Sequence, residues 1–243
     1  MSIPANQGMQ QLPLDLKLAD FALFTTFHAG PNEHVLNAVM QAATEPGQQV
    51  AWIWGRAGSG RSHLLQAAVA AASNAGRACA WLPLAADEGL QPAILEGMGA
   101  LDLLCVDDVD QIAGDAEWER QLFTLFEELR ARKGSLLVTA STTCAEAGFE
   151  LPDLASRLAS GPTWKLQNMD DDDRLAALQL RANWRGLDLP EETGRYLLRR
   201  VDRSSRALFE LLDRLDAAAL TAQRRLTVPF VKTVLEDKSG AQL

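Results

Sequence analysis

The segment that most constrains this chain is GRAGSGRSHLL, residues 55–65. It follows an apolar run, VAWIW at 50–54, and leads into an Ala-rich stretch that ends at Gly76. In a loop of this kind glycines let backbone amides turn toward phosphate oxygens, and the helix that follows points its positive end at them. The segment therefore predicts a strand, a phosphate-binding loop and a helix, the alternative being an ordinary turn between a strand and a helix.

The loop fits the pattern G-x-x-x-x-G-K-[ST] except that Arg61 replaces Lys. A lysine reaches between the β- and γ-phosphates as a compact charge, whereas a planar guanidinium grips one group in a fork. We therefore expect anion binding to persist and a γ-phosphate to be poorly placed. The residues of this segment predicted to hold the nucleotide are Gly55, Gly58, Ser59, Gly60, Arg61, Ser62 and His63, with the Ser62 hydroxyl also on Mg²⁺.

A pair of acids supports the same site. The run LLCVDD ends an apolar strand with Asp107 and Asp108. A carboxylate at such a strand end can hold the water shell of Mg²⁺, so Asp107 is the second predicted metal-binding residue. Acids at strand ends are common, and the prediction depends on the loop that precedes them.

Strand-like and helical patterns alternate through the first two thirds of the chain. Further strands are expected within 77–84, 101–110, 135–141 and 163–166, and a helix between 115 and 134 places Trp118, Leu122, Phe123, Phe126 and Leu129 at helical spacing. Such alternation predicts an α/β fold with a doubly wound, parallel, five-stranded sheet and helices on both faces.

The pattern changes near residue 168. The segments 169–186, 189–201, 204–223 and 227–237 are all helical in pattern, with no strand between them. We therefore expect a tail at 1–20, a nucleotide-binding α/β domain at 21–167 and a small helical domain at 168–243. Four consecutive acids, Asp170 to Asp173, could suggest a metal site, but acids in a first turn cap the helix and suit its dipole, which is the interpretation we favour.

Composition narrows the class of protein. The formal net charge is −9, which argues against strong, charge-driven binding of nucleic acid. The three cysteines, Cys79, Cys105 and Cys144, lack metal-ligand spacing and are expected to be buried reduced thiols, as in a cytoplasmic protein. No N-terminal signal pattern or long apolar run is present, so we expect neither export nor a membrane anchor.

Together, the loop, the acid pair and the helical end resemble the AAA+ family, and within it the DnaA-related regulators of replication initiation. The likeness extends from the tail to 227–237 and includes the Arg-containing loop, LPDLASRL at 151–158, LQLRANWRGLDLPEETGRYLLRRVDR at 178–203 and TAQRRLTVPFVK at 221–232. The resemblance implies that the helical domain is an AAA+ lid.

The resemblance also implies roles for single residues. Arg157 matches the arginine finger that the family presents to a nucleotide on a neighbouring subunit, where its fixed charge would stabilise a transferred phosphoryl group. Arg206 matches the lid arginine called sensor 2. Ser141 stands where the family has an Asn or Asp sensor, and with Arg61 it makes self-catalysed hydrolysis less favourable. Asp108 could orient water or simply end a strand, and both arginines could be ordinary surface charges.

The tail contains QLPLDL, which resembles the motif that docks bacterial proteins on the replicative sliding clamp. Pro13 disfavours helix and keeps the segment extended. The alternative is a tail strand folded against the core. The predicted clamp-binding residues are Gln11, Leu12, Pro13, Leu14, Asp15 and Leu16.

Three functions follow as hypotheses. The first is a regulator that holds ADP or another nucleoside diphosphate, docks on the DNA-loaded clamp and offers Arg157 to ATP on the initiator DnaA, with self-association left open. The second is an autonomous AAA+ ATPase such as a helicase loader. A DNA-reading initiator ranks last, because the charge is acidic and about one helix at most remains after 227–237. A diverged regulator without clamp binding also stays open.

Overall fold

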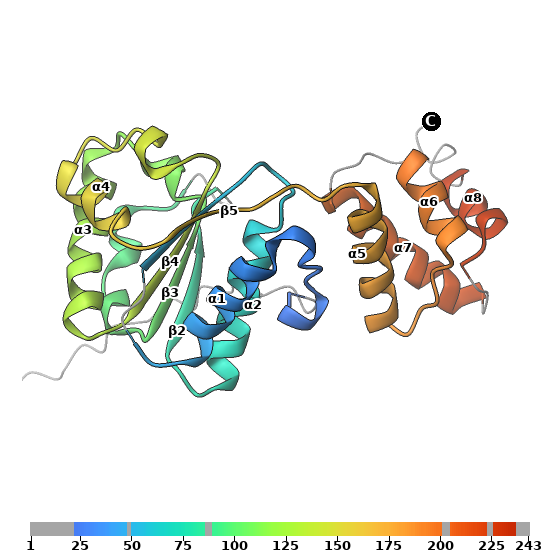
Figure 1. The fold of residues 1–243 in the computed structure, drawn as a ribbon, viewed down its shortest axis with the longest axis horizontal. Helices are drawn as coiled ribbons and strands as arrows, with labels where there is room; N and C mark the ends of the chain where they lie inside the picture. Colours follow the sequence, from blue (N-terminus) through green and yellow to red (C-terminus); the bar gives the residue numbers. More distant parts are fainter. Residues whose placement is uncertain (1–21, 48–49, 86–88, 201–204, 223–225, 237–243) are drawn as a thin grey trace, which may run out of the picture.

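A computed structural model of the chain describes residues 22–47, 50–85, 89–200, 205–222 and 226–236. Its first part is a parallel sheet in the order β2-β3-β4-β1-β5, so the α/β fold class is confirmed (Figure 1). The strands are β1 (Val50–Trp54), β2 (Cys79–Pro83), β3 (Leu103–Asp107), β4 (Ser135–Ala140) and β5 (Thr163–Lys165). β1 lies between β4 and the edge strand β5, so the loop after β1 emerges beside the ends of these two strands.

Helices cover both faces of this sheet (Figure 1). They are α1 (Glu33–Thr44), α2 (Arg61–Asn74), α3 (Ala116–Ala131) and α4 (Pro152–Leu158). Short 3₁₀ segments fill the connections: η1 (Phe24–Thr26), η2 (Gly30–Asn32), η3 (Pro92–Leu95), η4 (Met98–Ala100), η5 (Val109–Ile112) and η6 (Cys144–Glu146). The helix expected from the spacing of Trp118 to Leu129 is α3.

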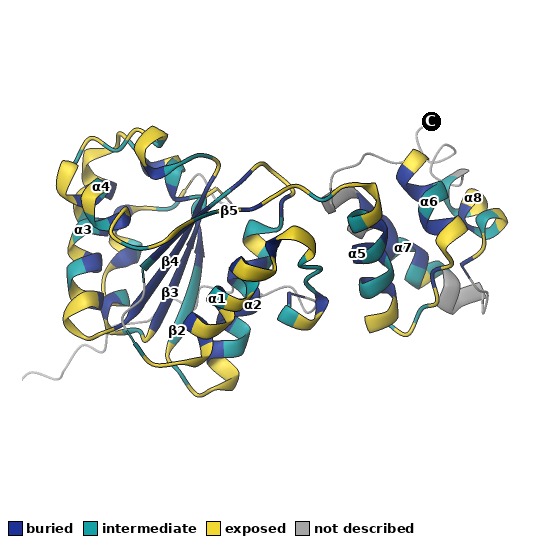
Figure 2. Ribbon diagram, in the orientation of Figure 1, coloured by how far each residue is buried: buried dark blue, intermediate teal, exposed yellow. Residues whose placement is uncertain are grey.

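The sheet has an apolar core on each face, because successive side chains of a strand point to opposite faces. Trp52, Leu104 and Val138 pack with α3 and α4 on one face. Ile53, Cys105 and Leu137 pack with α1 and α2 on the other. Figure 2 shows β1, β3 and β4 as buried through their central length, with exposed residues on the outer sides of the helices.

The C-terminal part is helical, with α5 (Asp171–Trp184), α6 (Glu191–Arg200), α7 (Ser205–Ala222) and α8 (Val228–Glu236) around their own apolar core. The run of acids caps α5, as expected: the Asp170 carboxylate accepts a hydrogen bond from the Asp173 amide at 2.8 Å, and the Asp173 carboxylate accepts one from the Asp170 amide. The predicted domain boundary at 167/168 falls in the connection between β5 and α5.

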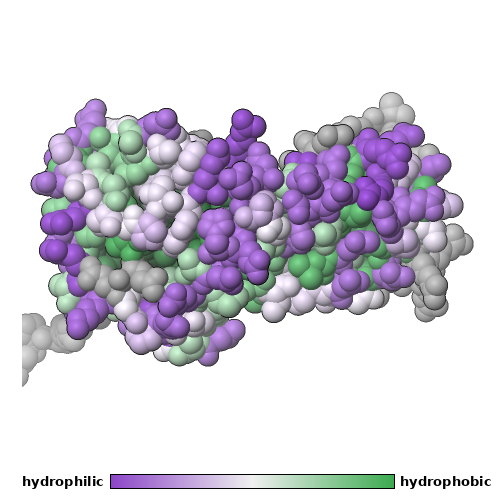
Figure 3. All heavy atoms as spheres, viewed as in Figure 1, coloured by the Kyte–Doolittle hydropathy of each residue, from purple (hydrophilic) through white to green (hydrophobic). Residues whose placement is uncertain are grey.

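The segment before α1 joins the two parts. Asn32, which is buried, donates to the Gln167 carbonyl at 3.1 Å and accepts from the Gln167 amide at 2.7 Å. His28 Nε2 lies 3.0 Å from Asp173 Oδ1 in the first turn of α5. Hydrophilic residues cover much of the strip where the two parts meet (Figure 3). The His28–Asp173 contact therefore links the two parts, and the Asn32–Gln167 bonds fix the connection between them.

The cysteines are free, with Cys105 and Cys144 buried and Cys79 half-buried. Burial raises the pKa of the Cys105 thiol well above its usual value, which keeps it protonated. Within the described residues, the search for a helix long and apolar enough to cross a membrane found none.

Candidate functional site

The phosphate loop connects β1 to α2. Gly58 and Gly60 adopt left-handed backbone, with φ of 79° and 98°, which glycine allows without strain. The Gly55 amide donates to the Ala140 carbonyl at 3.2 Å, tying the loop to the end of β4. Because Gly60 lacks a side chain that could cap α2, the first amides of this helix stay available to an anion.

A segment from the N-terminal side covers the start of α2. The Phe27 ring packs edge-on against His63, and a Cβ placed on Gly60 would lie 2.8 Å from that ring. His63 Nε2 lies 3.1 Å from the Leu23 carbonyl and 3.3 Å from Thr26 Oγ1. Burial lowers the pKa of His63, partly offset by the Leu23 carbonyl and reinforced by the charge of Arg181. His63 is thus neutral at physiological pH and holds the N-terminal segment on α2.

Arg61, the residue that departs from the phosphate-loop pattern, is turned toward β3. Its Nη2 lies 2.8 Å from Asp108 Oδ1, and only 12% of its side chain is exposed. Nη1 is buried and has no hydrogen-bond partner in the described part of the chain. The structure therefore brings together two residues that the sequence singled out separately.

The acids after β3 form a small network with β4. Asp107 is buried, and Oδ1 accepts a hydrogen bond from the Thr139 hydroxyl, which also accepts from the Asp108 amide at 3.0 Å. Asp108 itself has a left-handed backbone, with φ of 54°. Burial and the neighbouring Asp107 raise the pKa of Asp108, while the Arg61 guanidinium lowers it.

Ser141, the residue at the sensor position, lies just beyond β4. Its hydroxyl donates to Asp110 Oδ2, and its amide donates to the same oxygen at 3.1 Å. Sequence reasoning missed Thr139 and Asp110, although both lie in or beside segments predicted to end at this edge of the sheet. The polar residues at the ends of β3 and β4 are thus bonded to one another.

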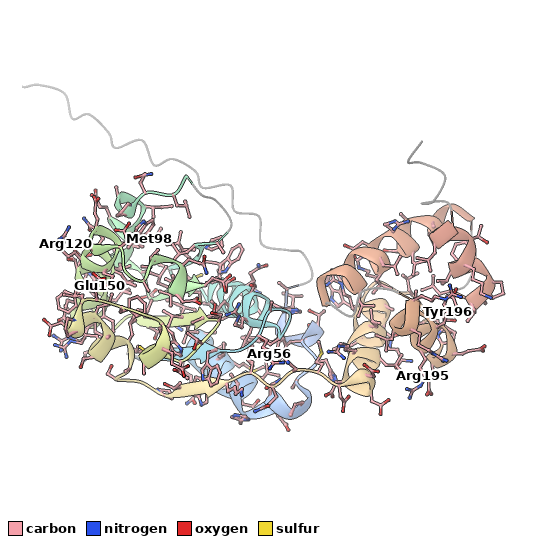
Figure 4. The ribbon with its side chains drawn as sticks, turned by 90° about the horizontal axis from the view of Figure 1, so that it is seen from above. Arg56, Met98, Arg120, Glu150, Arg195 and Tyr196 are labelled. Carbon is pink, nitrogen blue, oxygen red and sulfur yellow. The ribbon has the colours of Figure 1, made fainter. Side chains whose placement is uncertain are left out.

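The residues present fit a nucleotide with Mg²⁺. Ser59 Oγ and Arg61 Nη1 are buried and unpartnered within the described residues, and such groups are usually satisfied by an acceptor. Gly58 and Ser62 are exposed. Arg56, also in the loop, lies on the side of the α/β domain nearer the helical domain (Figure 4). The loop amides would hold phosphate, and the Ser62 hydroxyl and Asp107 carboxylate are the oxygen ligands that Mg²⁺ prefers.

Arg157, the predicted arginine finger, does not belong to the elements that form the phosphate loop. It belongs to α4, on the sheet face opposite α2, and 42% of its side chain is exposed. Its Nε lies 3.0 Å from Glu127 Oε1 on α3, and the other oxygen of Glu127 pairs with Arg130. In Figure 4 Glu150, two residues before α4, lies at the end of the α/β domain away from the helical domain.

Buried Glu119 fixes the segment that leads into α4. Its carboxylate accepts hydrogen bonds from the amides of Gly114 at 2.7 Å, Glu150 at 3.0 Å and Leu151 at 2.6 Å. A buried carboxylate of this kind needs such donors to offset the loss of water. The base of the helix that bears Arg157 is therefore tied to α3.

Arg206 and the tail motif cannot be placed in the site. The backbone of Arg206 lies in α7, but its side chain and residues 11–16 lie outside what the structure describes. A different lid arginine approaches α2: Arg181 of α5 is buried and lies 3.5 Å from Asp213. Burial lowers the pKa of Arg181 to about 10, and its charge acts on His63. Its helical pattern alone does not distinguish it from surface arginines.

Comparison with known proteins gives two family matches. Residues 171–235, from α5 into α8, match the family described as Hda, lid domain. Residues 28–144, which include the phosphate loop and the acid pair, match the family described as Novel STAND NTPase 5. The helical domain is thus identified as a lid, and the α/β domain as an NTPase-type fold.

Solved structures agree on the fold. Domain III of the Thermotoga maritima replication initiation protein DnaA superposes with a TM-score of 0.74 at 21% identity, over 91% of this chain and 98% of that one. AMPPCP-bound DnaA from Aquifex aeolicus gives 0.64 at 19% identity, over 81% of this chain and 65% of that one. The Thermotoga maritima RuvB Holliday junction branch migration motor gives 0.61 at 13% identity, over 88% and 72%. The chain therefore has the fold of DnaA domain III, and its C-terminal helices match the Hda lid-domain family.

Proposed function

We propose that this protein regulates replication initiation by acting on ATP held by another AAA+ protein, the initiator DnaA. The observation on which the proposal depends is the position of Arg157. It lies on the face of the sheet opposite the helix of its own phosphate loop, with its side chain partly exposed and paired with Glu127. A guanidinium there serves a nucleotide bound elsewhere, because its charge can stabilise a transferred phosphoryl group only at contact.

The chain's own site would hold a nucleoside diphosphate, such as ADP, and turn over ATP poorly. An acid that could orient water, Asp108, is paired with Arg61, and the sensor-position Ser141 is bonded to Asp110. Bound Mg²⁺ would supply charge neutralisation for the phosphates. The loop amides, Ser62 and Asp107 would hold the nucleotide in place without completing a hydrolytic centre.

The N-terminal tail would bring the protein to DNA that is being replicated. In the proposal residues 11–16 bind the DNA-loaded sliding clamp, so that Arg157 meets the initiator only after DNA synthesis has begun. This step rests on the sequence motif alone. Its test is whether Leu12→Ala together with Leu14→Ala removes co-elution with the purified clamp while leaving the melting temperature unchanged.

The central experiment measures hydrolysis of ATP bound to DnaA in the presence of loaded clamp. Arg157→Ala should lower the stimulated rate by about 10³-fold, the usual effect of an arginine finger. Arg157→Lys should rescue little, because a single ammonium lacks the fork. Arg130→Ala is the matched control, since Arg130 also pairs with Glu127, and it should keep the rate within about threefold.

An unchanged rate in Arg157→Ala would overturn the proposal.

A second candidate, an autonomous ATPase, is favoured by the presence of Ser62 and Asp107 at the positions that Mg²⁺ needs. Multiple turnovers of ATP by the purified chain alone, abolished by Asp107→Asn, would establish that candidate instead. Loss of those turnovers in Arg157→Ala would identify a second copy of this chain as the receiving partner.

A further inference from the structure

The Arg61–Asp108 ion pair occupies the part of the site where the phosphate-loop lysine normally serves the outer phosphates. Arg61 is the first residue of α2, and Asp108 follows β3 directly. The two are 2.8 Å apart, with side chains 12% and 25% exposed. A charge pair screened from water to this degree resists separation, because the remaining carboxylate would stay partly buried and unpaired.

The acidic residues around Asp108 make separation of the Arg61–Asp108 pair still less favourable. Asp108 lies next to buried Asp107, so two neighbouring carboxylates lie at this edge of the sheet. Most of the Asp108 side chain is screened from water, and the Arg61 guanidinium is the cation placed against it. Moving Arg61 to a phosphate would leave the Asp108 carboxylate without this cation, beside buried Asp107.

The Arg61 guanidinium nevertheless contacts Asp108 through only one of its two terminal nitrogens. Nη2 serves Asp108, while Nη1 is buried with no hydrogen-bond partner among the described residues. Ser59 Oγ, in the same loop, is also buried and unpartnered there. A buried N–H without an acceptor costs free energy, so the site is poised to accept one further anionic oxygen. A phosphate seated on the loop amides supplies such an oxygen.

We infer that the Arg61–Asp108 pair selects a nucleoside diphosphate over a triphosphate. One guanidinium nitrogen stays on Asp108 while the other serves the terminal phosphate of the diphosphate, so the buried Nη1 finds a partner. A γ-phosphate requires the same guanidinium and adds negative charge beside Asp108. This inference rests on the proposal that the loop binds a nucleotide, and it assigns the selectivity of that site to one pair of residues.

The test measures binding of ADP and of the nonhydrolysable triphosphate AMPPCP to the full chain by calorimetry, with Mg²⁺ present. The wild type should favour ADP by at least about tenfold, and Asp108→Asn should reduce that ratio by about tenfold, since Arg61 is then free to serve a γ-phosphate. Asn tolerates the left-handed backbone of position 108, so the fold should persist. Arg61→Lys is a second variant and should also approach equal binding.

Asp110→Asn is the matched control, because Asp110 bonds Ser141 and not Arg61. It should keep most of the ADP preference. An equal loss in Asp110→Asn and Asp108→Asn would overturn the inference in favour of a diffuse charge effect, as would a wild type that binds both nucleotides equally. A wild type that binds neither would instead remove the proposed nucleotide site, and the inference with it.

Discussion

At the residue scale, the role of a side chain in the site depends on the residue that it contacts as much as on its own chemical type. The sequence marks Arg61, Asp108 and Ser141 as departures from, or ambiguous members of, a known pattern. It does not indicate that Arg61 pairs with Asp108 or that Ser141 binds Asp110, because these contacts join segments from different strands. Long-range pairing of this kind follows from sheet order, which a single sequence leaves open.

His63 gives the first prediction, a dependence of stability on pH. Its pKa is lowered in the folded chain by burial, whereas in the unfolded chain it has the ordinary value of about 6.5. Below that pH the unfolded chain binds the additional proton first, so acidification destabilises the fold. His63→Gln keeps an amide N–H for the Leu23 carbonyl but does not titrate.

The measurement is the melting temperature from neutral pH down to about pH 5.5. We expect the wild type to lose more stability than His63→Gln over this window. His28 and His34 are present in both proteins, so the difference reports position 63. Parallel curves for the two proteins would show that burial of His63 has no consequence for folding.

At the element scale, the strands and helices of the α/β domain largely follow from the sequence. β1, β3 and β4 are short apolar runs between turn residues, and α3 shows clear helical spacing. The exception is α1, whose segment precedes the phosphate loop and lacks a comparable motif. Asn32 explains part of that difficulty: it stands at the N-cap position of α1, but its side chain bonds Gln167 and not the helix.

The join between the phosphate loop and α2 gives the second prediction. Gly60→Ala would force a left-handed backbone on Ala, at a cost of about 1–2 kcal/mol, and would place its Cβ 2.8 Å from the Phe27 ring. We expect a larger total loss in the free energy of unfolding than from the backbone alone, together with loss of nucleotide binding. Urea unfolding and nucleotide titration measure the two effects.

Gly76→Ala is the control for backbone strain. Gly76 also has a left-handed backbone, with φ of 74°, but nothing lies within 4 Å of a Cβ placed there. This variant should lose about 1–2 kcal/mol and keep nucleotide binding. Equal effects of the two substitutions would mean that the Phe27 contact is unimportant to the loop.

At the scale of the whole molecule, the two domains are joined by few described polar contacts. The sequence predicts a helical domain from residue 168, and residues 171–235 match a lid family. The way in which the lid is held was not predictable, since His28, Asn32 and Gln167 form no local pattern. Their contacts exist only because the segment before α1 crosses the start of the lid.

Asn32 gives the third prediction. Asn32→Ala removes two hydrogen bonds to the Gln167 backbone and leaves those groups without their partner, which should cost about 1–3 kcal/mol. Faster amide exchange at Gln167 should accompany the loss, because the connection to α5 is then free to move. Hydrogen exchange and urea unfolding measure these changes.

Asp173→Asn serves for comparison. Its contact with His28 is partly exposed, so the variant should lose less than about 1 kcal/mol and keep slow exchange at Gln167. If Asn32→Ala behaves like this mild variant, the junction depends on packing and not on the Asn32 bonds.

The Glu119 carboxylate has a consequence for the proposed docking of a partner on α4. By accepting from the amides of Glu150 and Leu151, it fixes the approach to α4 before any partner arrives. In the proposed function, docking of a partner on α4 would then require little ordering of that segment, so its entropy cost would be small and the encounter would resemble that of two rigid bodies. Such a partner would need the complementary shape beforehand, and small changes in its surface would decide whether it is recognised.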